Sequence, residues 1–154
     1  MPKRRDAIRM TDEEVRAFLR ERQTMNIATI GPDGNIHLVA MWYGFLDGNP
    51  AFETFAKSQK VLNLRRDPRI TALVEDGDQY ENLRGVEIVG KAVIHDDADT
   101  LMRVAKDVVM RYWTPATEEE AEVMAHALAN KRVAVEIVPE KIVSWDHRKL
   151  GGTY

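Results

Sequence analysis

Two lysines and a serine, Lys57, Ser58 and Lys60, lie between an apolar segment and the start of a helical pattern. The first amide groups of a helix have no partner within the helix and the helix dipole is positive there, so this position favours anions. The ammonium and hydroxyl groups add positive charge and hydrogen-bond donors. These residues predict a site for a phosphate monoester or diester. The alternative is a solvated basic helix, and the residues alone do not separate the two.

Aromatic side chains form the second feature. Trp42 and Tyr43 interrupt the alternating pattern of residues 36–45, on a strand that we expect to neighbour Thr54 and Phe55. An extended aromatic ring system can lie across such strand ends, with main-chain groups at its polar edge. In the alternative interpretation, the two side chains face the core and a partner subunit.

The common forms of side-chain catalysis have no support in this sequence. There is no cysteine, so thiolate catalysis and thiolate metal sites are excluded. The four histidines are scattered, with no pair at metal-ligand spacing: His37, His95, His126 and His147. Ser58 and Ser144 have no local base and no nucleophile-elbow motif. We therefore predict no metal site and assign no catalytic side chain.

The composition is that of a globular protein. The 154 residues are 44% hydrophobic and 31% charged, which fits one domain, 1–154. A net charge of −3 makes nucleic-acid binding unexpected. No apolar run approaches the ~20 residues of a membrane helix. Residues 1–10 have no apolar signal-peptide region, so we expect a cytoplasmic protein with a loose N-terminal arm.

The first half of the chain must position the lysines and aromatic residues. Thr11 and Glu14 predict a capping box that opens a helix to about Arg22. Three strands follow, with turn residues between them, and predict an antiparallel meander: 25–30, 36–45 and 51–55. Ser58 is expected to cap the next helix, which Asp67 and Pro68 end.

The second half adds strands, helices and a tail. Gly85 and Gly90 indicate a bulge or a close backbone approach within a long strand. The expected elements are strands at 69–74, 83–94 and 132–145, a helix after Asp97, a helix capped by a second box at 117–120, and a tail at 147–154. About six strands with peripheral helices predict an α+β fold with a small antiparallel β-barrel.

The order of these motifs resembles the split β-barrel flavin-binding proteins, the relatives of pyridoxamine 5′-phosphate oxidase. The motifs are NIATIGPDG at 26–34, MWY at 41–43, Thr54, KSQK at 57–60 and NLRRDP at 63–68. LRGV at 83–86 and SWDHRKLGGTY at 144–154 are similar to the actinobacterial branch that uses the deazaflavin coenzyme F-420. The resemblance covers residues 11–154 and implies a six-stranded antiparallel split β-barrel.

The resemblance also implies a homodimer, with cofactors in grooves between the subunits and a small-molecule acceptor. The implied phosphate-binding residues are Lys57, Ser58, Lys60 and Asn63. The residues implied to line the cofactor ring, largely through backbone groups, are Ala40, Met41, Trp42, Thr54 and Phe55. Trp145 and the tail, with His147 and Lys149, would close the pocket near the ring.

Two departures from the oxidases distinguish this chain. Gly85 stands where those enzymes usually carry a glutamine, and the arginine-rich C-terminal signature for pyridoxal phosphate is missing. Both argue against vitamin B6 chemistry, and they favour a cofactor with a longer polyanionic tail over FMN. Arg65, Arg66 and residues 3–5 are available to attract such a tail, or to serve as solubilising surface charges.

Our leading hypothesis is a reductase that uses reduced coenzyme F-420. Hydride would pass to an unsaturated small molecule such as a conjugated alkene, quinone, lactone or tetrapyrrole. The cofactor carries the difficult chemistry in such enzymes, which agrees with the lack of a catalytic side chain. The alternatives are an FMN-dependent oxidoreductase, a cofactor-binding carrier without turnover, and a heme-binding protein with His37 or His147 as ligand.

Overall fold

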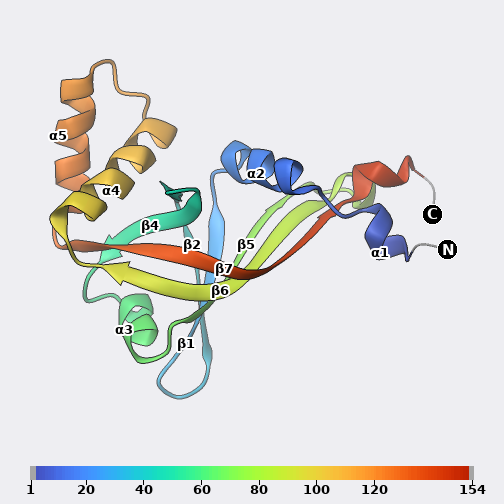
Figure 1. Cartoon of the computed structure of the whole chain (residues 1–154), viewed down its shortest axis with the longest axis horizontal. Helices are drawn as coiled ribbons and strands as arrows, with labels where there is room; N and C mark the ends of the chain where they lie inside the picture. The colour runs from blue at the N-terminus through green and yellow to red at the C-terminus, as the bar shows by residue number, and fades with distance from the viewer. Residues whose placement is uncertain (1–2, 153–154) are drawn as a thin grey trace.

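A curled antiparallel sheet of seven strands, a half-barrel, organises the chain (Figure 1). The computed structural model describes residues 3–152. The strands are β1 (Met25–Ile30), β2 (Ile36–Met41), β3 (Gly44–Leu46), β4 (Asn49–Phe55), β5 (Arg69–Asp76), β6 (Arg84–His95) and β7 (Arg132–Asp146). Their order across the sheet is β2-β1-β5-β6-β7-β4-β3. The α+β fold of antiparallel strands and helices is therefore confirmed.

The strand predicted at residues 36–45 is two strands, so the sheet has seven strands and the expected six is wrong. The break falls at Trp42 and Tyr43. The Tyr43 side chain is fully buried, and its hydroxyl donates to the carbonyl groups of Leu19 and Arg22. β2 and β3 lie at opposite ends of the strand order. The two hairpins of the predicted meander, β1–β2 and β3–β4, are present, but the meander is broken between β2 and β3.

Within residues 3–152, five helices and two 3-10 turns accompany the sheet. They are α1 (Arg4–Ala7), α2 (Asp12–Glu21), α3 (Gln59–Arg66), α4 (Ala98–Tyr112), α5 (Glu118–Ala129), η1 (Tyr80–Asn82) and η2 (His147–Leu150). The Thr11 capping box is confirmed, since Thr11 and Glu14 satisfy each other's backbone N–H groups at 3.1 and 2.7 Å. The second box is half formed, because the Glu120 carboxylate accepts from the N–H of Ala116 instead of Thr117.

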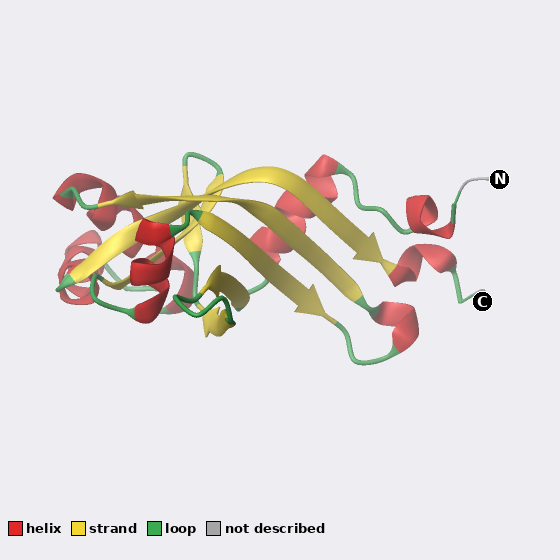
Figure 2. Cartoon of the chain, turned by 90° about the horizontal axis from the view of Figure 1, so that it is seen from below, coloured by secondary structure: helices red, strands yellow, loops and turns green. Residues whose placement is uncertain are grey.

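The N-terminal segment differs from the expected loose arm. Residues 4–7 form a helical turn, and the segment that follows is attached to the end of β7. The N–H of Asp146 donates to the carbonyl of Ile8 at 2.7 Å, and the N–H of Met10 donates to Ser144 Oγ at 3.1 Å. Figure 2 shows α1 and η2 side by side at this end of the sheet. Residues 1–2 and 153–154 of the expected arm and tail lie outside the described residues.

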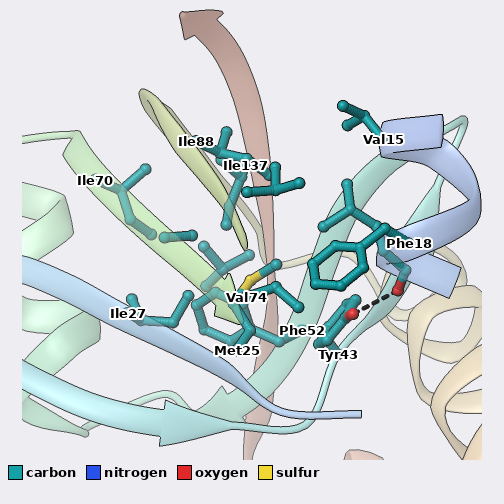
Figure 3. Close-up of a cluster of buried hydrophobic side chains, with 14 of the residues drawn as sticks. Val15, Phe18, Met25, Ile27, Tyr43, Phe52, Ile70, Val74, Ile88 and Ile137 are labelled. Atoms are coloured by element: carbon teal, nitrogen blue, oxygen red, sulfur yellow. Dashed lines mark hydrogen bonds between the residues drawn. The ribbon is translucent and has the colours of Figure 1, made fainter. Parts of the chain in front are cut away.

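The main core fills the concave side of the sheet, where α2 covers it (Figure 3). Val15, Phe18 and Leu19 of α2 pack on buried side chains that alternate along the strands, as the two-residue strand period requires. A separate apolar cluster joins α4 to β3, β4 and β7, and another joins α4 to α5. The predicted irregularity at Gly90 is confirmed, because a bulge lies between Val89 and Gly90.

Within residues 3–152, no helix combines the length and the apolar character that crossing a membrane requires.

Candidate functional site

A groove of about 680 Å³ lies where β4 ends, α3 begins and β7 starts. It is lined by Phe55, Ala56, Lys57, Ser58 and Lys131. The N–H of Ala56 donates to the carbonyl of Lys131 at 3.0 Å, which fixes the two walls relative to each other. The predicted phosphate-binding residues Lys57 and Ser58 therefore share a hollow large enough for a ligand group.

Ser58 takes the N-cap position of α3 as predicted, but its side chain makes no capping hydrogen bond. Its Oγ is buried and has no hydrogen-bond partner within the described residues. A buried hydroxyl without a partner is costly, so such atoms are rare in native proteins. The Ser58 hydroxyl and the amide end of α3 together fit an anionic oxygen that would complete their hydrogen bonds.

Lys60 turns from α3 toward β4. Its Nζ donates to Thr54 Oγ1 at 3.1 Å, and Thr54 is almost fully buried. Burial lowers the pKa of Lys60, and the nearby positive charge of Arg132 lowers it further. The structure thus brings Thr54 and Lys60 together beside the groove.

A buried ion pair supports the same region. Glu53 is 6% exposed, and its Oε1 accepts from Arg132 Nη1 at 2.9 Å. The Arg132 guanidinium also lies 4.3 Å from the ring centroid of Phe55, a cation–π contact. Burial raises the pKa of Glu53, against the opposing effect of Arg132. Sequence reasoning missed this pair because its members lie on strands that are distant in the chain. A charge within an apolar strand pattern was the available signal.

Asn63 is placed inside the packing and not in the groove. Its side chain is fully buried, and its Nδ2 donates to Thr29 Oγ1 at 3.0 Å. Its Oδ1 accepts from Gln59 Nε2 at 2.8 Å. The side chain thus holds α3 against β1 with its own hydrogen bonds. The structure therefore separates Asn63 from the other residues of the predicted phosphate site.

The predicted ring-binding segment lies at the end of β2. Ala40 is exposed and Met41 packs against the core. Trp42 is 46% exposed, and its ring stacks on Tyr112 of α4 at a centroid distance of 4.4 Å. The β3–β4 ladder stops at Ala51, so the expected pairing of this aromatic strand with Thr54 and Phe55 does not extend that far.

Trp145 lies at the other end of β7 from the groove. From Arg132 to Trp145 is roughly 40 Å along an extended strand. Its indole covers Gly85, because a Cβ on Gly85 would lie 2.1 Å from Trp145 Cζ2. The predicted close approach at Gly85 is confirmed. Within one chain, Trp145 therefore lies far along β7 from the groove that Lys57 lines.

The four histidines lie on different elements: β2, β6, α5 and η2. No group of three or more His, Asp or Glu side chains between residues 3 and 152 is arranged to hold a metal. His37 is half-buried on β2, and its Nδ1 has no hydrogen-bond partner among the residues of that range. His147 Nδ1 lies 2.7 Å from the carbonyl oxygen of Tyr80.

Comparisons with known proteins agree with the split-barrel architecture. The family model for pyridoxamine 5′-phosphate oxidase matches residues 11–146. A conserved hypothetical protein of Mycobacterium tuberculosis is 48% identical with a TM-score of 0.93, and the match covers 99% of this chain and 95% of that one. Among curated proteins, no sequence matches.

Two more distant structures share the fold. An F-420 reductase is 23% identical with a TM-score of 0.60, and the match covers 92% of this chain and 98% of that one. The heme storage protein of Vibrio cholerae is 15% identical with a TM-score of 0.66, with 86% and 94% covered. At these identities the likeness concerns the fold alone.

Proposed function

Because the chain belongs to the pyridoxamine 5′-phosphate oxidase family, we propose that it is an oxidoreductase that uses coenzyme F-420. In this proposal, reduced cofactor delivers hydride to an unsaturated small molecule: a conjugated alkene, quinone, lactone or tetrapyrrole. The observation that carries the proposal is the buried, unpartnered Ser58 hydroxyl in the groove that Lys57 also lines. A cofactor phosphate would satisfy both groups.

The residues of the groove have defined roles in this proposal. Lys57 supplies positive charge at its exposed mouth, and Ser58 with the first amides of α3 supplies hydrogen-bond donors. Phe55 offers an apolar surface, since the residue is 55% exposed. The bound deazaflavin supplies the hydride, and the protein orients it and excludes water. No side chain of the chain is required as nucleophile.

The choice of a deazaflavin over FMN is supported by the residues around Trp145. The indole occupies the space above Gly85, so a glutamine cannot be placed there without moving the indole. The arginines available to attract a polyanionic tail already have partners in the structure. Arg65 binds Asp96 at 2.8 Å, and Arg66 donates to the carbonyl of Ile30 at 2.5 Å. Lys3 and Arg5 line a separate groove with Lys141. FMN remains the alternative cofactor.

A homodimer completes the proposal. The outer face of β2 exposes Ile36 and Leu38, at 64% and 67%. Val93 of β6 is also exposed. Large exposed apolar side chains gathered on one sheet are typical of protein interfaces. A second copy would cover them and would bring its own Trp145 toward the groove.

A titration tests the proposed function. Apo protein is titrated with coenzyme F-420 and with FMN while tryptophan fluorescence is followed. We expect micromolar or tighter binding of the deazaflavin and much weaker binding of FMN. Tighter binding of FMN than of the deazaflavin would establish FMN as the cofactor. If the protein binds neither of these but binds heme, the heme-binding alternative is established. Turnover with an acceptor panel then separates an enzyme from a carrier.

The Lys57→Ala variant tests the site within that experiment. We expect about tenfold weaker cofactor binding and an unchanged Tm, since the ammonium is exposed and charge-assisted contacts contribute about 1.5–3 kcal/mol. Lys141→Ala is the matched control, because Lys141 is an exposed lysine near the far end of β7. Equal affinities of Lys57→Ala and wild type would refute the phosphate assignment.

A further inference from the structure

Lys131 lines the same groove from the wall opposite α3. It lies in the connection between α5 and β7, far in sequence from Lys57 and Ser58. Its carbonyl accepts from the N–H of Ala56 at 3.0 Å. This bond joins the start of β7 to the residue just before Lys57, so Lys131 is held at a fixed position beside the predicted phosphate group.

The backbone of Lys131 is in the left-handed region, with φ of 59°. Helices commonly end with a residue in this conformation, and that residue is usually glycine or asparagine because a larger side chain is strained there. The end of α5 therefore explains why residue 131 has a left-handed backbone, but it does not explain why this residue is a lysine. A lysine at this point adds an ammonium group to the groove at the expense of backbone strain.

The charges around the groove are unequal. Lys57 and Lys131 line it, and the cationic residues Lys60 and Arg132 lie on the elements beside it, in α3 and at the start of β7. Lys60 is bonded to Thr54, and Arg132 is bonded to Glu53. Neither the Lys57 nor the Lys131 ammonium has a hydrogen bond or an ion pair within residues 3–152. These two groups are therefore left to neutralise an anion.

We infer that Lys131 is a direct ligand of the cofactor phosphate and that, with Lys57, it holds this phosphate from opposite walls of the groove. The inference rests on the proposed function and adds to it a residue from outside the α3 region. The ligand class is any cofactor that carries a phosphate monoester or diester next to an apolar ring-bearing portion. Because the contact is an exposed ionic one, it is expected to weaken with salt.

Two variants separate the ammonium group from the backbone strain. Lys131→Gln keeps a long side chain and the strain, and Lys131→Gly removes both. Both should bind coenzyme F-420 about tenfold more weakly than wild type, because both lose one charge-assisted contact. The salt dependence of binding should also be shallower in both. The Lys131→Gly variant should have a Tm no lower than that of wild type, since glycine adopts the observed φ without strain.

A phosphate-free ligand is the specific control. The deazaflavin riboside without the phosphate and its tail should bind wild type, Lys131→Gln and Lys131→Gly equally. Lys141→Gln controls for the loss of one lysine charge elsewhere on β7 and should bind F-420 like wild type.

The outcomes distinguish this inference from the proposed function. If wild type binds F-420 or FMN and both Lys131 variants match it, the inference is overturned and the proposed function stands. Loss of affinity in Lys131→Gly alone would also overturn it, because Lys131→Gln lacks the ammonium group as well and the effect would then come from the backbone. If wild type binds no phosphorylated cofactor, both fail together. Weaker binding in both variants, confined to phosphorylated ligands, would confirm Lys131 as a ligand.

Discussion

The indole of Trp145 lies against the backbone of Gly85, so close that a Cβ on Gly85 would be 2.1 Å from Trp145 Cζ2. The two residues face each other in the β6–β7 ladder. Any side chain at position 85 would therefore displace the indole. The glycine creates the space in which the tryptophan lies, and the tryptophan in turn fills the position above the sheet.

Substitution of Gly85 tests this relationship. Gly85→Ala should lower the free energy of unfolding by about 1–3 kcal/mol, because overpacking forces the indole or the backbone to move. In a Trp145→Ala background, the same change should cost much less, since the obstructing ring is absent. Urea denaturation of the four proteins measures this coupling. An equal cost in both backgrounds would show that the strain arises elsewhere.

The buried hydroxyl of Ser58 predicts opposite effects on stability and on binding. Ser58→Ala removes a buried hydroxyl that lacks a partner, so the apo protein should be more stable by about 1 kcal/mol. The same variant should bind the cofactor more weakly. Thr11→Ala is the matched control at another N-cap: its hydroxyl accepts from Glu14 N–H, so its loss should cost about 1 kcal/mol. A destabilised Ser58→Ala would contradict the assignment.

Asn63 is expected to affect stability and not binding. Asn63→Ala leaves Thr29 and Gln59 without their shared partner and should cost about 1–3 kcal/mol of unfolding free energy. Cofactor affinity, measured at a temperature where the variant is folded, should stay near that of wild type. Leu62→Ala, at a half-exposed position of the same helix, is the control. Weakened binding with unchanged stability would instead return Asn63 to the phosphate site.

Tyr43 predicts an alkaline dependence of stability. Burial raises the pKa of the Tyr43 hydroxyl to about 12, from an ordinary value of 10.0. Between these values the folded state keeps a proton that the unfolded state releases. Stability is therefore fully present below pH 10 and falls as the pH rises through this interval. Absorbance titration near 295 nm should show one tyrosine that ionises late or only on unfolding.

The Tyr43→Phe variant is the control for that titration. It should lack the late-ionising group, and its stability should fall less between pH 10 and pH 12. It should also be less stable at neutral pH by roughly 1 kcal/mol, since the hydrogen bonds to the carbonyl groups of Leu19 and Arg22 are lost. A late-ionising tyrosine that persists in Tyr43→Phe would assign the raised pKa to another residue.

Local sequence determined the elements and their ends. The Thr11 capping box, the end of α3 at Arg66 before Asp67 and Pro68, and the position of Ser58 at the start of α3 all follow from backbone chemistry within a few residues. The motif order also gave the family, because the spacing of short motifs is a property of the sequence. The position of Lys57 just before α3 also follows from local sequence.

The tertiary structure alone decided which distant residues meet. The division of residues 36–45 at Tyr43 depends on the carbonyl groups of Leu19 and Arg22 at the end of α2, and the Glu53–Arg132 pair depends on the register of β4 with β7. Lys131 reaches the groove by the same pairing, whereas Trp145 is carried to the other end of its strand. Strand register is fixed by packing across the whole sheet, so contacts between distant segments do not follow from local pattern.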